Sequence, residues 1–391
     1  MMPNCVTQRW NYPTDIRVGA GAAGNITHLC IEKGMASPLV VTDKGMAESD
    51  VVKEILSLCR EADLNVALFS NLEGNPGKTS VKEGINAFIS GDHDGVIAIG
   101  GGSALDVGKT IAVAALQNLD IWDLDDNGSA WQYFDPYKMV NTIAIPTTAG
   151  TGSEVGRAAV ITDEESHTKR VLFHPRMLPA VVVLDPKVTV GLPRTLTAAT
   201  GMDALSHALE AYCSPSFHPM GEGIALNAIY LVHEHLVQAT ENGEDLTARM
   251  GMLTASMMGA TAFQKGLGAM HALAHPLGAI YGSHHGLLNA ILMPYVLVAN
   301  RAAIESKICV LARYLDLENH SFEAFVSWIL ELRETLGIPH SLADIGINDG
   351  QAEKIGLLAK SDPSDGGNPV SLSAVDYSKL FIRAVNGLLE G

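Results

Sequence analysis

The chain has 391 residues, of which 47% are apolar, so it is long enough for two domains and too hydrophobic for a disordered protein. Its formal charge of −17 is spread along the sequence, which argues against a nucleic-acid partner bound through phosphates and against docking on anionic lipid.

The N-terminal segment lacks the basic start and apolar run of a signal peptide, and no stretch approaches about 18 consecutive apolar residues. The five cysteines are far apart in the sequence and form no C-x-x-C pair, so neither a disulfide framework nor a thiolate metal site is indicated. We therefore expect a cytoplasmic protein without a membrane partner.

Short β-branched runs alternate with helical stretches between about residues 14 and 190. They predict strands at residues 38–43, 65–69, 95–100, 141–146 and 180–185. Because these runs are apolar on both faces, they are typical of a parallel sheet that is covered by crossover helices. We predict that residues 1–192 form an α/β domain with a mostly parallel sheet.

The pattern changes after residue 192 to long segments rich in Ala, Leu and Met, with helical spacing and hardly any strand signal. Gly191 and Pro193 mark the boundary, since both residues interrupt regular structure. We predict that residues 193–391 form an all-helical domain.

A glycine turn at Gly100, Gly101 and Gly102 follows the third predicted strand and precedes a predicted helix. Such a turn lets backbone amides approach the pyrophosphate of a dinucleotide, and we expect Ser103 to cap the helix whose positive end faces the anion. The spacing is not G-x-G-x-x-G, and a plain tight strand-to-helix connection is the alternative.

Two further features favour a dinucleotide site. Residues 146–154 follow another predicted strand and are rich in hydroxyls and glycine, which suits contacts to phosphate, ribose or nicotinamide. Asp43 closes the first strand, where a carboxylate accepts hydrogen bonds from ribose hydroxyls and repels a 2′-phosphate. This predicts NAD rather than NADP, although Asp43 is also compatible with a solvated turn.

Metal-ligand side chains lie in the second half of the chain. Asp203 and His207 are four residues apart in a helix-like stretch, so both project from one face. Four histidines follow within fifteen residues, namely His271, His275, His284 and His285. Among Ala, Leu, Met and Gly, an unpaired imidazole costs about 1–3 kcal/mol. We predict that Asp203, His207, His271 and His285 hold a divalent metal; ordinary core or surface histidines are the alternative.

Long motifs in a fixed order give the chain a family resemblance nearly from end to end. They lie at residues 12–14, 19–21, 74–76, 100–106, 146–154, 201–207, 271–286 and 368–369. The chain resembles the iron-containing (group III) alcohol dehydrogenases, which include lactaldehyde reductases and 1,3-propanediol dehydrogenases.

The resemblance implies a dehydroquinate synthase-like architecture, with a dinucleotide-binding domain, a helical metal-binding domain and a cleft between them. The implied metal ligands are Asp203, His207, His271 and His285, and His275 corresponds to a non-ligand histidine near the reacting carbon. The implied cofactor contacts are Asp43, Asn75, Gly101, Gly102, Ser103, Asp106, Thr147, Thr148 and Lys169. The choice of His285 over His284 follows from the family's Pro-His-Gly motif, which reads His284-His285-Gly286 here.

Three imidazoles and one carboxylate accept Fe(II), Zn(II), Mn(II) or Co(II). The resemblance favours Fe(II), and Zn(II) is the alternative because the Irving–Williams order ranks it tighter. We expect the metal to act as a Lewis acid on the alkoxide or carbonyl oxygen while hydride moves between a small alcohol, diol or hydroxy acid and NAD. His275 is expected to relay the proton, with an orienting or helix-capping role as the alternative.

The expected protein is thus an NAD-dependent iron-containing alcohol dehydrogenase. The two rival functions are a non-catalytic NAD- or metal-binding homologue and a lyase of the dehydroquinate synthase type. Residues 7–17 are rich in aromatic and β-forming residues and are suited to adding an edge strand to a partner, so we expect a homodimer or a higher homo-oligomer.

Overall fold

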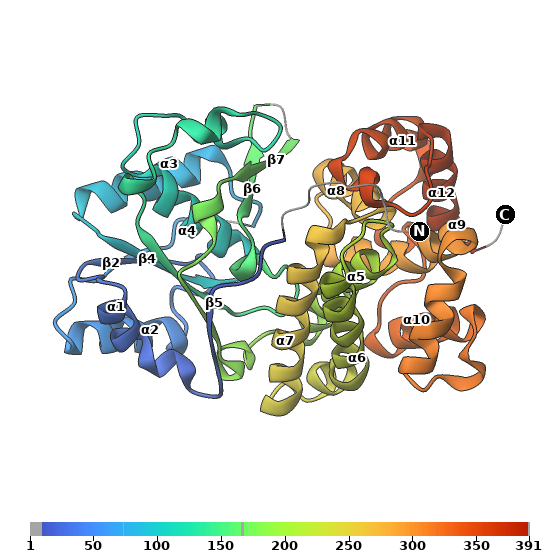
Figure 1. Ribbon diagram of the computed structural model, residues 1–391, viewed down its shortest axis with the longest axis horizontal. Helices are drawn as coiled ribbons and strands as arrows, with labels where there is room; N and C mark the ends of the chain where they lie inside the picture. The colour runs from blue at the N-terminus through green and yellow to red at the C-terminus, as the bar shows by residue number, and fades with distance from the viewer. Residues whose placement is uncertain (1–9, 73, 166–167, 390–391) are drawn as a thin grey trace. The chain divides into compact units, whose positions relative to one another are not determined.

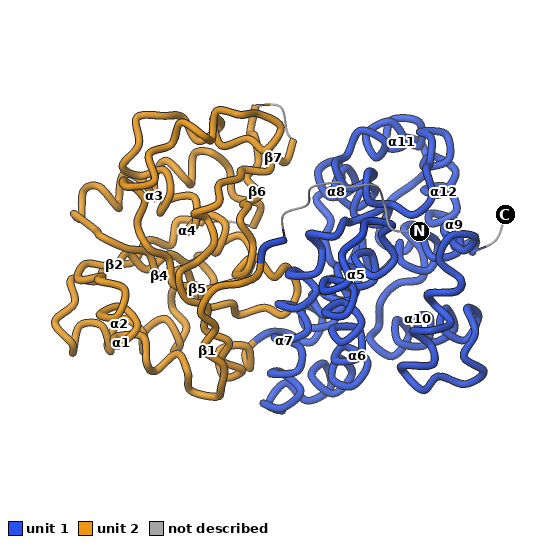
Figure 2. Tube along the Cα trace, in the orientation of Figure 1, with its two compact units in different colours: residues 1–11, 192–391 blue, residues 12–191 orange. Residues whose placement is uncertain are grey.

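The computed structural model describes residues 10–389 apart from residues 73, 166 and 167. The chain divides into two compact units, one made of residues 12–191 and the other of residues 192–391 together with the residues before Tyr12 (Figure 2). Asn11 is held in the second unit, where its backbone N–H donates to Gln264 Oε1 at 2.8 Å.

The first unit contains a six-stranded parallel sheet in the order β1-β8-β5-β4-β2-β3 (Figure 1). Its strands are β1 (Asp15–Val18), β2 (Pro38–Val41), β3 (Ala67–Phe69), β4 (Gly95–Gly100), β5 (Asn141–Pro146) and β8 (Val181–Leu184). Its helices are α1 (Ile26–Glu32), α2 (Asp50–Glu61), α3 (Lys78–Ser90) and α4 (Gly102–Ala114). Each of the five predicted runs contains a strand, and the mostly parallel α/β unit is confirmed.

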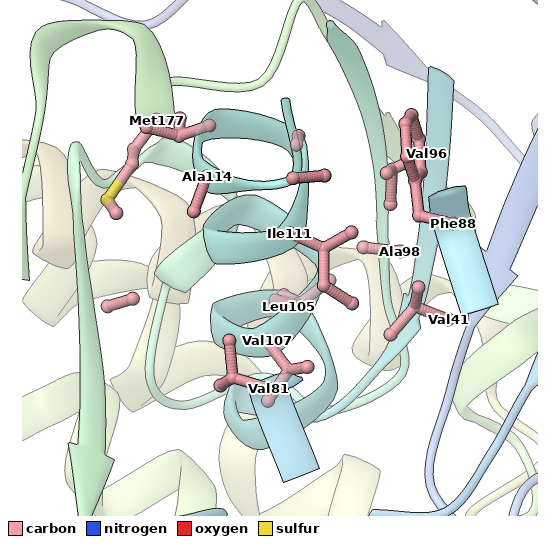
Figure 3. Close-up of a cluster of buried hydrophobic side chains, with 14 of the residues drawn as sticks. Val41, Val81, Phe88, Val96, Ala98, Leu105, Val107, Ile111, Ala114 and Met177 are labelled. Carbon is pink, nitrogen blue, oxygen red and sulfur yellow. The ribbon is translucent and has the colours of Figure 1, made fainter. Parts of the chain in front are cut away.

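Side chains of the central strands alternate between two hydrophobic clusters, because successive residues of a strand point to opposite faces. On one face Val41, Val96 and Ala98 pack with residues of α3 and α4, such as Phe88 and Ile111 (Figure 3). Residues of the same strands on the other face pack with α1 and α2. The sheet is therefore buried on both sides, which explains the continuous apolar runs in the sequence.

A two-stranded antiparallel sheet was not predicted from the sequence. It pairs β6 (Ala158–Asp163) with β7 (Thr168–Phe173). Lys169 and Arg170 interrupt the apolar pattern of β7, and most of that strand is only half-buried. A partly exposed hairpin of this kind lacks the uninterrupted apolar run that identifies the strands of the main sheet.

Strand β1 corrects part of the expectation for residues 7–17. Asp15, Ile16 and Arg17 pair in parallel with β8 of the same chain, and β1 is an edge strand of this sheet. Residues 7–9 lie outside the described residues. Among residues 10–17 only residues 15–17 belong to a strand, and they use one of their edges within the chain.

The second unit is built from helices, and residues 192–389 contain no strand, as predicted. The helices are α5 (Arg194–Cys213), α6 (Pro219–Glu241), α7 (Leu246–Ala262), α8 (Ala269–Tyr281), α9 (His285–Tyr314), α10 (Phe322–Leu336), α11 (Ala352–Ser361) and α12 (Ala374–Asn386) (Figure 1). Short 3-10 helices connect them, including η8 (Phe263–Lys265) and η12 (Pro363–Gly367). Helix α5 is buried along residues 197–213 and packs against α6, α7 and α9, so it forms the centre of the unit.

Helix α9 is the one helix of the described residues that is long and apolar enough to cross a membrane. Within its most apolar window, 67% of the helix is buried inside the protein. It packs against α5, α8 and α10, so its hydropathy is accounted for by its place in the core.

Candidate metal centre and cofactor-binding edge

Helix α5 places Asp203 and His207 one turn apart and buries both. Two neighbouring helices approach this turn closely because they present glycines to it. A β-carbon at Gly259 of α7 would lie 3.4 Å from His207 Cβ, and one at Gly286 of α9 would collide with the carbonyl oxygen of Ala199. The absence of a side chain at Gly286 therefore lets the first turn of α9 reach Asp203.

Helices α8 and α9 bring the remaining predicted ligands to the same place. One ligand atom from each of Asp203, His207 and His271 lies within 4.8 Å of the other two, and all three residues are buried. His285 Nε2 lies 3.6 Å from Asp203 Oδ1, and the His285 ring centroid is 5.3 Å from that of His271. The four predicted ligands thus converge, whereas His284 is an exposed residue at the N-cap of α9.

The charges at this cluster suit metal ligation. Burial alone would raise the pKa of the Asp203 carboxyl, but the neighbouring His207, His285 and His271 hold it well below its usual range. Burial, together with His207, lowers the pKa of His271 well below its ordinary value. Metal ligation requires an ionised carboxylate and neutral imidazoles, and these shifts favour an ionised Asp203 and a neutral His271. The donor set therefore fits a divalent cation.

Glu210 is a buried residue of this site that the sequence analysis missed. Its carboxylate lies 2.7 Å from His271 Nδ1 and accepts hydrogen bonds from the backbone N–H groups of Gly268 and Met270, each at 2.7 Å. Burial raises the pKa of Glu210 to about 7, against the opposing effect of the two backbone hydrogen bonds. The available signal was its spacing, since residues 203, 207 and 210 lie on one face of a helix.

Asn289 is a second missed residue and is fully buried. Its Nδ2 donates to Asp203 Oδ1 at 2.9 Å and lies 3.1 Å from His285 Nε2 and 3.3 Å from His271 Nε2. Asn289 follows His285 by one helix turn, so helical periodicity was again the only signal in the sequence.

His275 lies one turn after His271 on α8 and borders the cluster. Its ring stacks on His285 with centroids 5.3 Å apart and an interplanar angle of 10°. Its Nδ1 is 2.8 Å from Asp362 Oδ2, and the other oxygen of Asp362 accepts from the backbone N–H of Ser364 at the start of η12. Asp362 is 87 residues away in the chain, which is why sequence spacing did not reveal it.

The predicted cofactor residues of the first unit fall into two groups. The first lies at the carboxyl ends of β2, β4 and β5, where Asp43, the glycine turn and Thr147 meet. Gly100 has φ +146°, and a β-carbon there would lie 2.8 Å from Ala104 Cβ and 3.4 Å from Asp43 Oδ2. Thr147 donates its backbone N–H to the Gly100 carbonyl at 3.0 Å. Ligands of open parallel sheets bind at such an edge.

Ser103 does not cap α4, contrary to expectation. The N-cap of this helix is Gly101, which has no side-chain hydrogen bond to offer, and Ser103 is the second residue of the helix. A residue inside the first turn has helical backbone angles, so its hydroxyl is not in the capping position.

The carboxylate of Asp106 accepts hydrogen bonds from the segment that follows β5 and is not exposed to solvent. One carboxylate oxygen accepts from Ser153 Oγ at 2.5 Å and the other from the Val160 backbone N–H at 2.8 Å. The buried Lys109 ammonium lies 3.2 Å from the same carboxylate. These bonds tie α4 to the 153–160 segment.

Asn75 and Lys169 form the second group, around Thr162. Asn75 has φ +58°, and its carbonyl accepts from Thr162 Oγ1 at 3.3 Å. Lys169 lies opposite Thr162 in the β6–β7 ladder. The antiparallel hairpin therefore brings the 74–76 loop and Lys169 to one place.

Both halves of the chain match models of one protein family. Residues 13–186 match "Iron-containing alcohol dehydrogenase", and residues 197–385 match "Fe-containing alcohol dehydrogenase family, C-terminal". The chain is 37% identical to 4-hydroxybutyrate dehydrogenase of Cupriavidus necator, over 96% of this chain and 99% of the relative.

Solved structures agree with this relationship. A 1,3-propanediol oxidoreductase superposes with a TM-score of 0.91 at 34% identity, covering 97% of this chain and 100% of the other. Sulfoacetaldehyde reductase from Bifidobacterium kashiwanohense, solved in complex with NAD+, gives a TM-score of 0.89 at 28% identity, covering 97% and 99%.

These matches place the chain in the class of metal-dependent dehydrogenases. The chain belongs to the iron-containing alcohol dehydrogenase family and is an NAD-dependent enzyme of that family. The family resemblance and the fold expected from it are confirmed.

Proposed function

We propose that this enzyme transfers hydride between NAD and a small primary alcohol that has a second polar end, such as a diol or a hydroxy acid. The convergence of Asp203, His207, His271 and His285 carries the proposal, because a carboxylate and three imidazoles that meet at one place are a donor set for a catalytic divalent metal. The substrate class is supported by relatives named for 4-hydroxybutyrate and 1,3-propanediol.

The four converging residues are the proposed metal ligands, and Fe(II) is the proposed metal, with Zn(II) as the alternative. A divalent ion held there supplies Lewis-acid polarisation of the substrate oxygen. His285 is preferred to His284 because its Nε2 lies 3.6 Å from Asp203, whereas His284 is exposed. The burial of Asp203, His207 and His271 excludes water and strengthens every charge interaction at the site.

His275 is proposed to carry the proton between substrate and solvent. Asp362 lies against its Nδ1 at 2.8 Å, and this bond leaves Nε2 as the atom that accepts a hydroxyl proton. Burial of Asp362 acts to raise its pKa, but the hydrogen bond and charge of His275 and the hydrogen bonds from Ser364 together outweigh this and lower the pKa. The carboxylate therefore stays ionised and stabilises a protonated imidazole.

The proposed NAD site is the carboxyl edge of the main sheet. Its proposed contacts are Asp43, Asn75, Gly101, Gly102, Ser103, Asp106, Thr147, Thr148 and Lys169. Preference for NAD over NADP is proposed to come from Asp43, which lies beside the glycine turn. For Asp106 we propose an indirect contribution, because its carboxylate already accepts from Ser153 and Val160.

A cytoplasmic homo-oligomer is the proposed cellular form. Cys30, Cys59, Cys213 and Cys309 are free thiols, as expected in a reducing compartment. Strand β1 is at an edge of the main sheet, and an edge strand offers unpaired backbone groups to a second copy of the chain. Size measurement by light scattering tests the assembly.

The direct test is reconstitution. The protein is purified anaerobically and stripped with chelator, and NADH absorbance is followed with a panel of diols and hydroxy acids after addition of Fe(II), Zn(II) or Mn(II). We expect activity only with metal and NAD, its loss in His271→Ala, and its retention in His28→Ala, which removes an exposed histidine of α1. Tight NADH binding without turnover would favour a binding protein, and consumption of substrate without net NADH would favour a lyase.

A further inference from the structure

We propose that Glu210, which is not one of the metal ligands, is a positioning residue that keeps the hydrogen of His271 on Nδ1 and so leaves Nε2 for the metal. The inference rests on the metal site proposed above. It assigns a role in metal binding to a carboxylate that comes from the same helix as two of the ligands.

The contacts of Glu210 show which group donates. Three nitrogen atoms lie 2.7 Å from the oxygens of the Glu210 carboxylate. Two are the backbone nitrogens of Gly268 and Met270, whose N–H groups can only donate, and the third is Nδ1 of His271. The ionised carboxylate of Glu210 has no hydrogen of its own, so in that form it is the acceptor in the third contact as well. The bond with His271 is therefore completed by a hydrogen on Nδ1.

The position of this hydrogen decides whether His271 can bind a metal. A neutral imidazole carries one hydrogen, so a hydrogen on Nδ1 leaves a lone pair on Nε2. In the other tautomer an N–H group on Nε2 would point toward Asp203 and His207 and block ligation. With side-chain exposures of 1% for His271 and 4% for Glu210, water is not available to replace Glu210 as the acceptor.

The same carboxylate also fixes where α8 begins relative to α5. Gly268 is the N-cap of α8, and a β-carbon there would lie 3.1 Å from Glu210 Oε1, so the residue must be small. Asn368 caps the neighbouring backbone N–H, that of Ala269, at 3.1 Å, and its other hydrogen bonds join it to Asn300 and to the Val370 carbonyl. Both side chains thus cap α8, and Glu210 also contacts the proposed ligand His271.

This difference supplies a matched pair of variants, Glu210→Gln and Asn368→Ala. The amide of Glu210→Gln can donate to Nδ1 and so favours the tautomer with the hydrogen on Nε2. We expect Glu210→Gln to weaken Zn(II) binding by about 10- to 100-fold in a chelator competition, as is typical when the partner of a ligating histidine is lost. Asn368→Ala should lower the melting temperature while leaving Zn(II) affinity within about twofold of the wild type, because it removes the cap of Ala269 and the bonds to Asn300 and Val370 but leaves the bond between Glu210 and His271.

A second readout does not depend on metal. The NMR chemical shifts of the ring nitrogens are measured in metal-free protein with 15N-labelled histidine, and those of His271 are assigned by their loss in His271→Ala. They should report a hydrogen on Nδ1 in the wild type and on Nε2 in Glu210→Gln. If the wild type binds no Zn(II), the metal-site proposal fails, whereas the tautomer is still tested. If the wild type binds Zn(II) and Glu210→Gln binds it equally well, the role of Glu210 is wrong.

A third variant covers the case in which Glu210→Gln does not fold. Glu210→Asp keeps the carboxylate but shortens the side chain by one methylene, so the bond to His271 is stretched rather than reversed. We expect its Zn(II) affinity to lie between that of the wild type and that of Glu210→Gln, with the hydrogen still on Nδ1. Affinity equal to that of the wild type would contradict the proposal, because the 2.7 Å contact cannot be kept at that length.

Discussion

Asn289 joins Asp203 to the rest of the candidate metal centre through a hydrogen bond of 2.9 Å between Nδ2 and Oδ1. Both side chains are buried, and Asp203 comes from α5 whereas Asn289 comes from α9. The bond holds one carboxylate oxygen in a fixed direction, so that Asp203 does not have to be ordered when a cation binds.

Replacement of Asn289 by leucine should therefore weaken metal binding. We expect Asn289→Leu to lower Zn(II) affinity by about 10- to 100-fold, the usual effect of losing a group that orients a ligand. Asn300→Leu is the control, because Asn300 is a buried amide of the same helix that bonds to Asn368. The control should change stability without changing affinity, and an unchanged affinity in Asn289→Leu would remove Asn289 from the site.

Loss of the Asp362 carboxylate should affect proton transfer rather than metal content. In Asp362→Asn the imidazole of His275 loses the carboxylate that lies 2.8 Å from its Nδ1, so we expect kcat to fall by about 10- to 100-fold. Zn(II) affinity should stay within about twofold of the wild type, because His275 is not among the proposed ligands. Equal loss of metal and activity would show that Asp362 supports the fold only.

Glu154 should make the protein less stable as the pH rises. It is buried in the first unit, its Oε1 has no hydrogen-bond partner, and burial raises its pKa to about 7. Between about pH 4.5 and pH 7 the Glu154 carboxyl is therefore protonated in the folded protein, whereas in the unfolded chain, where its pKa is near 4.5, it has lost its proton. The free energy of unfolding falls over this interval because the folded state binds more protons.

Glu154→Gln tests this directly, since the amide resembles the protonated acid. We expect the variant and the wild type to unfold alike below about pH 4.5, and the variant to be more stable above pH 7 by at most about 3 kcal/mol. Urea denaturation at several pH values measures the difference. A constant difference across the pH range would show that Glu154 keeps an ordinary pKa.

Asp43 should set the choice between NAD and NADP. Asp43→Ser removes the negative charge and keeps an oxygen that can accept from the Met46 backbone N–H, a bond that Asp43 makes at 3.0 Å. We expect the ratio of kcat/KM for NAD to that for NADP to fall by about 10- to 100-fold, since a like charge beside a phosphate costs several kcal/mol. An unchanged ratio would mean that the 2′-hydroxyl lies elsewhere.

The sequence predicted those parts of the structure that depend on local pattern. Uninterrupted apolar runs located five strands of the main sheet, and helical spacing put Asp203 and His207 on one face of α5. Glu210 and Asn289 were missed because a buried polar residue in a helix has no distinctive neighbours in sequence. Their partners, His271 and Asp203, come from other helices, so their roles exist only after the chain has packed.

Ser103 shows the opposite case, in which a local rule gave the wrong answer. Serine next to a predicted helix start favours a cap, but α4 begins at Gly102, two residues before the start that a cap at Ser103 would give. The turn is governed instead by Gly100, whose positive φ and close contact with Ala104 set where the strand ends. Backbone geometry at one glycine therefore outweighed the side-chain preference of its neighbour.

The shared face of α5 also has a consequence for how this family can change. Asp203, His207 and Glu210 occupy three successive turns of one helix, so inserting a single residue among them would rotate everything beyond it by about 100°. An insertion before His207 would remove a ligand and the support of His271 together, and one after His207 would remove that support alone. Insertions between helices leave this spacing intact, so we expect length variation among natural relatives to be found in the connecting loops and never within residues 203–210.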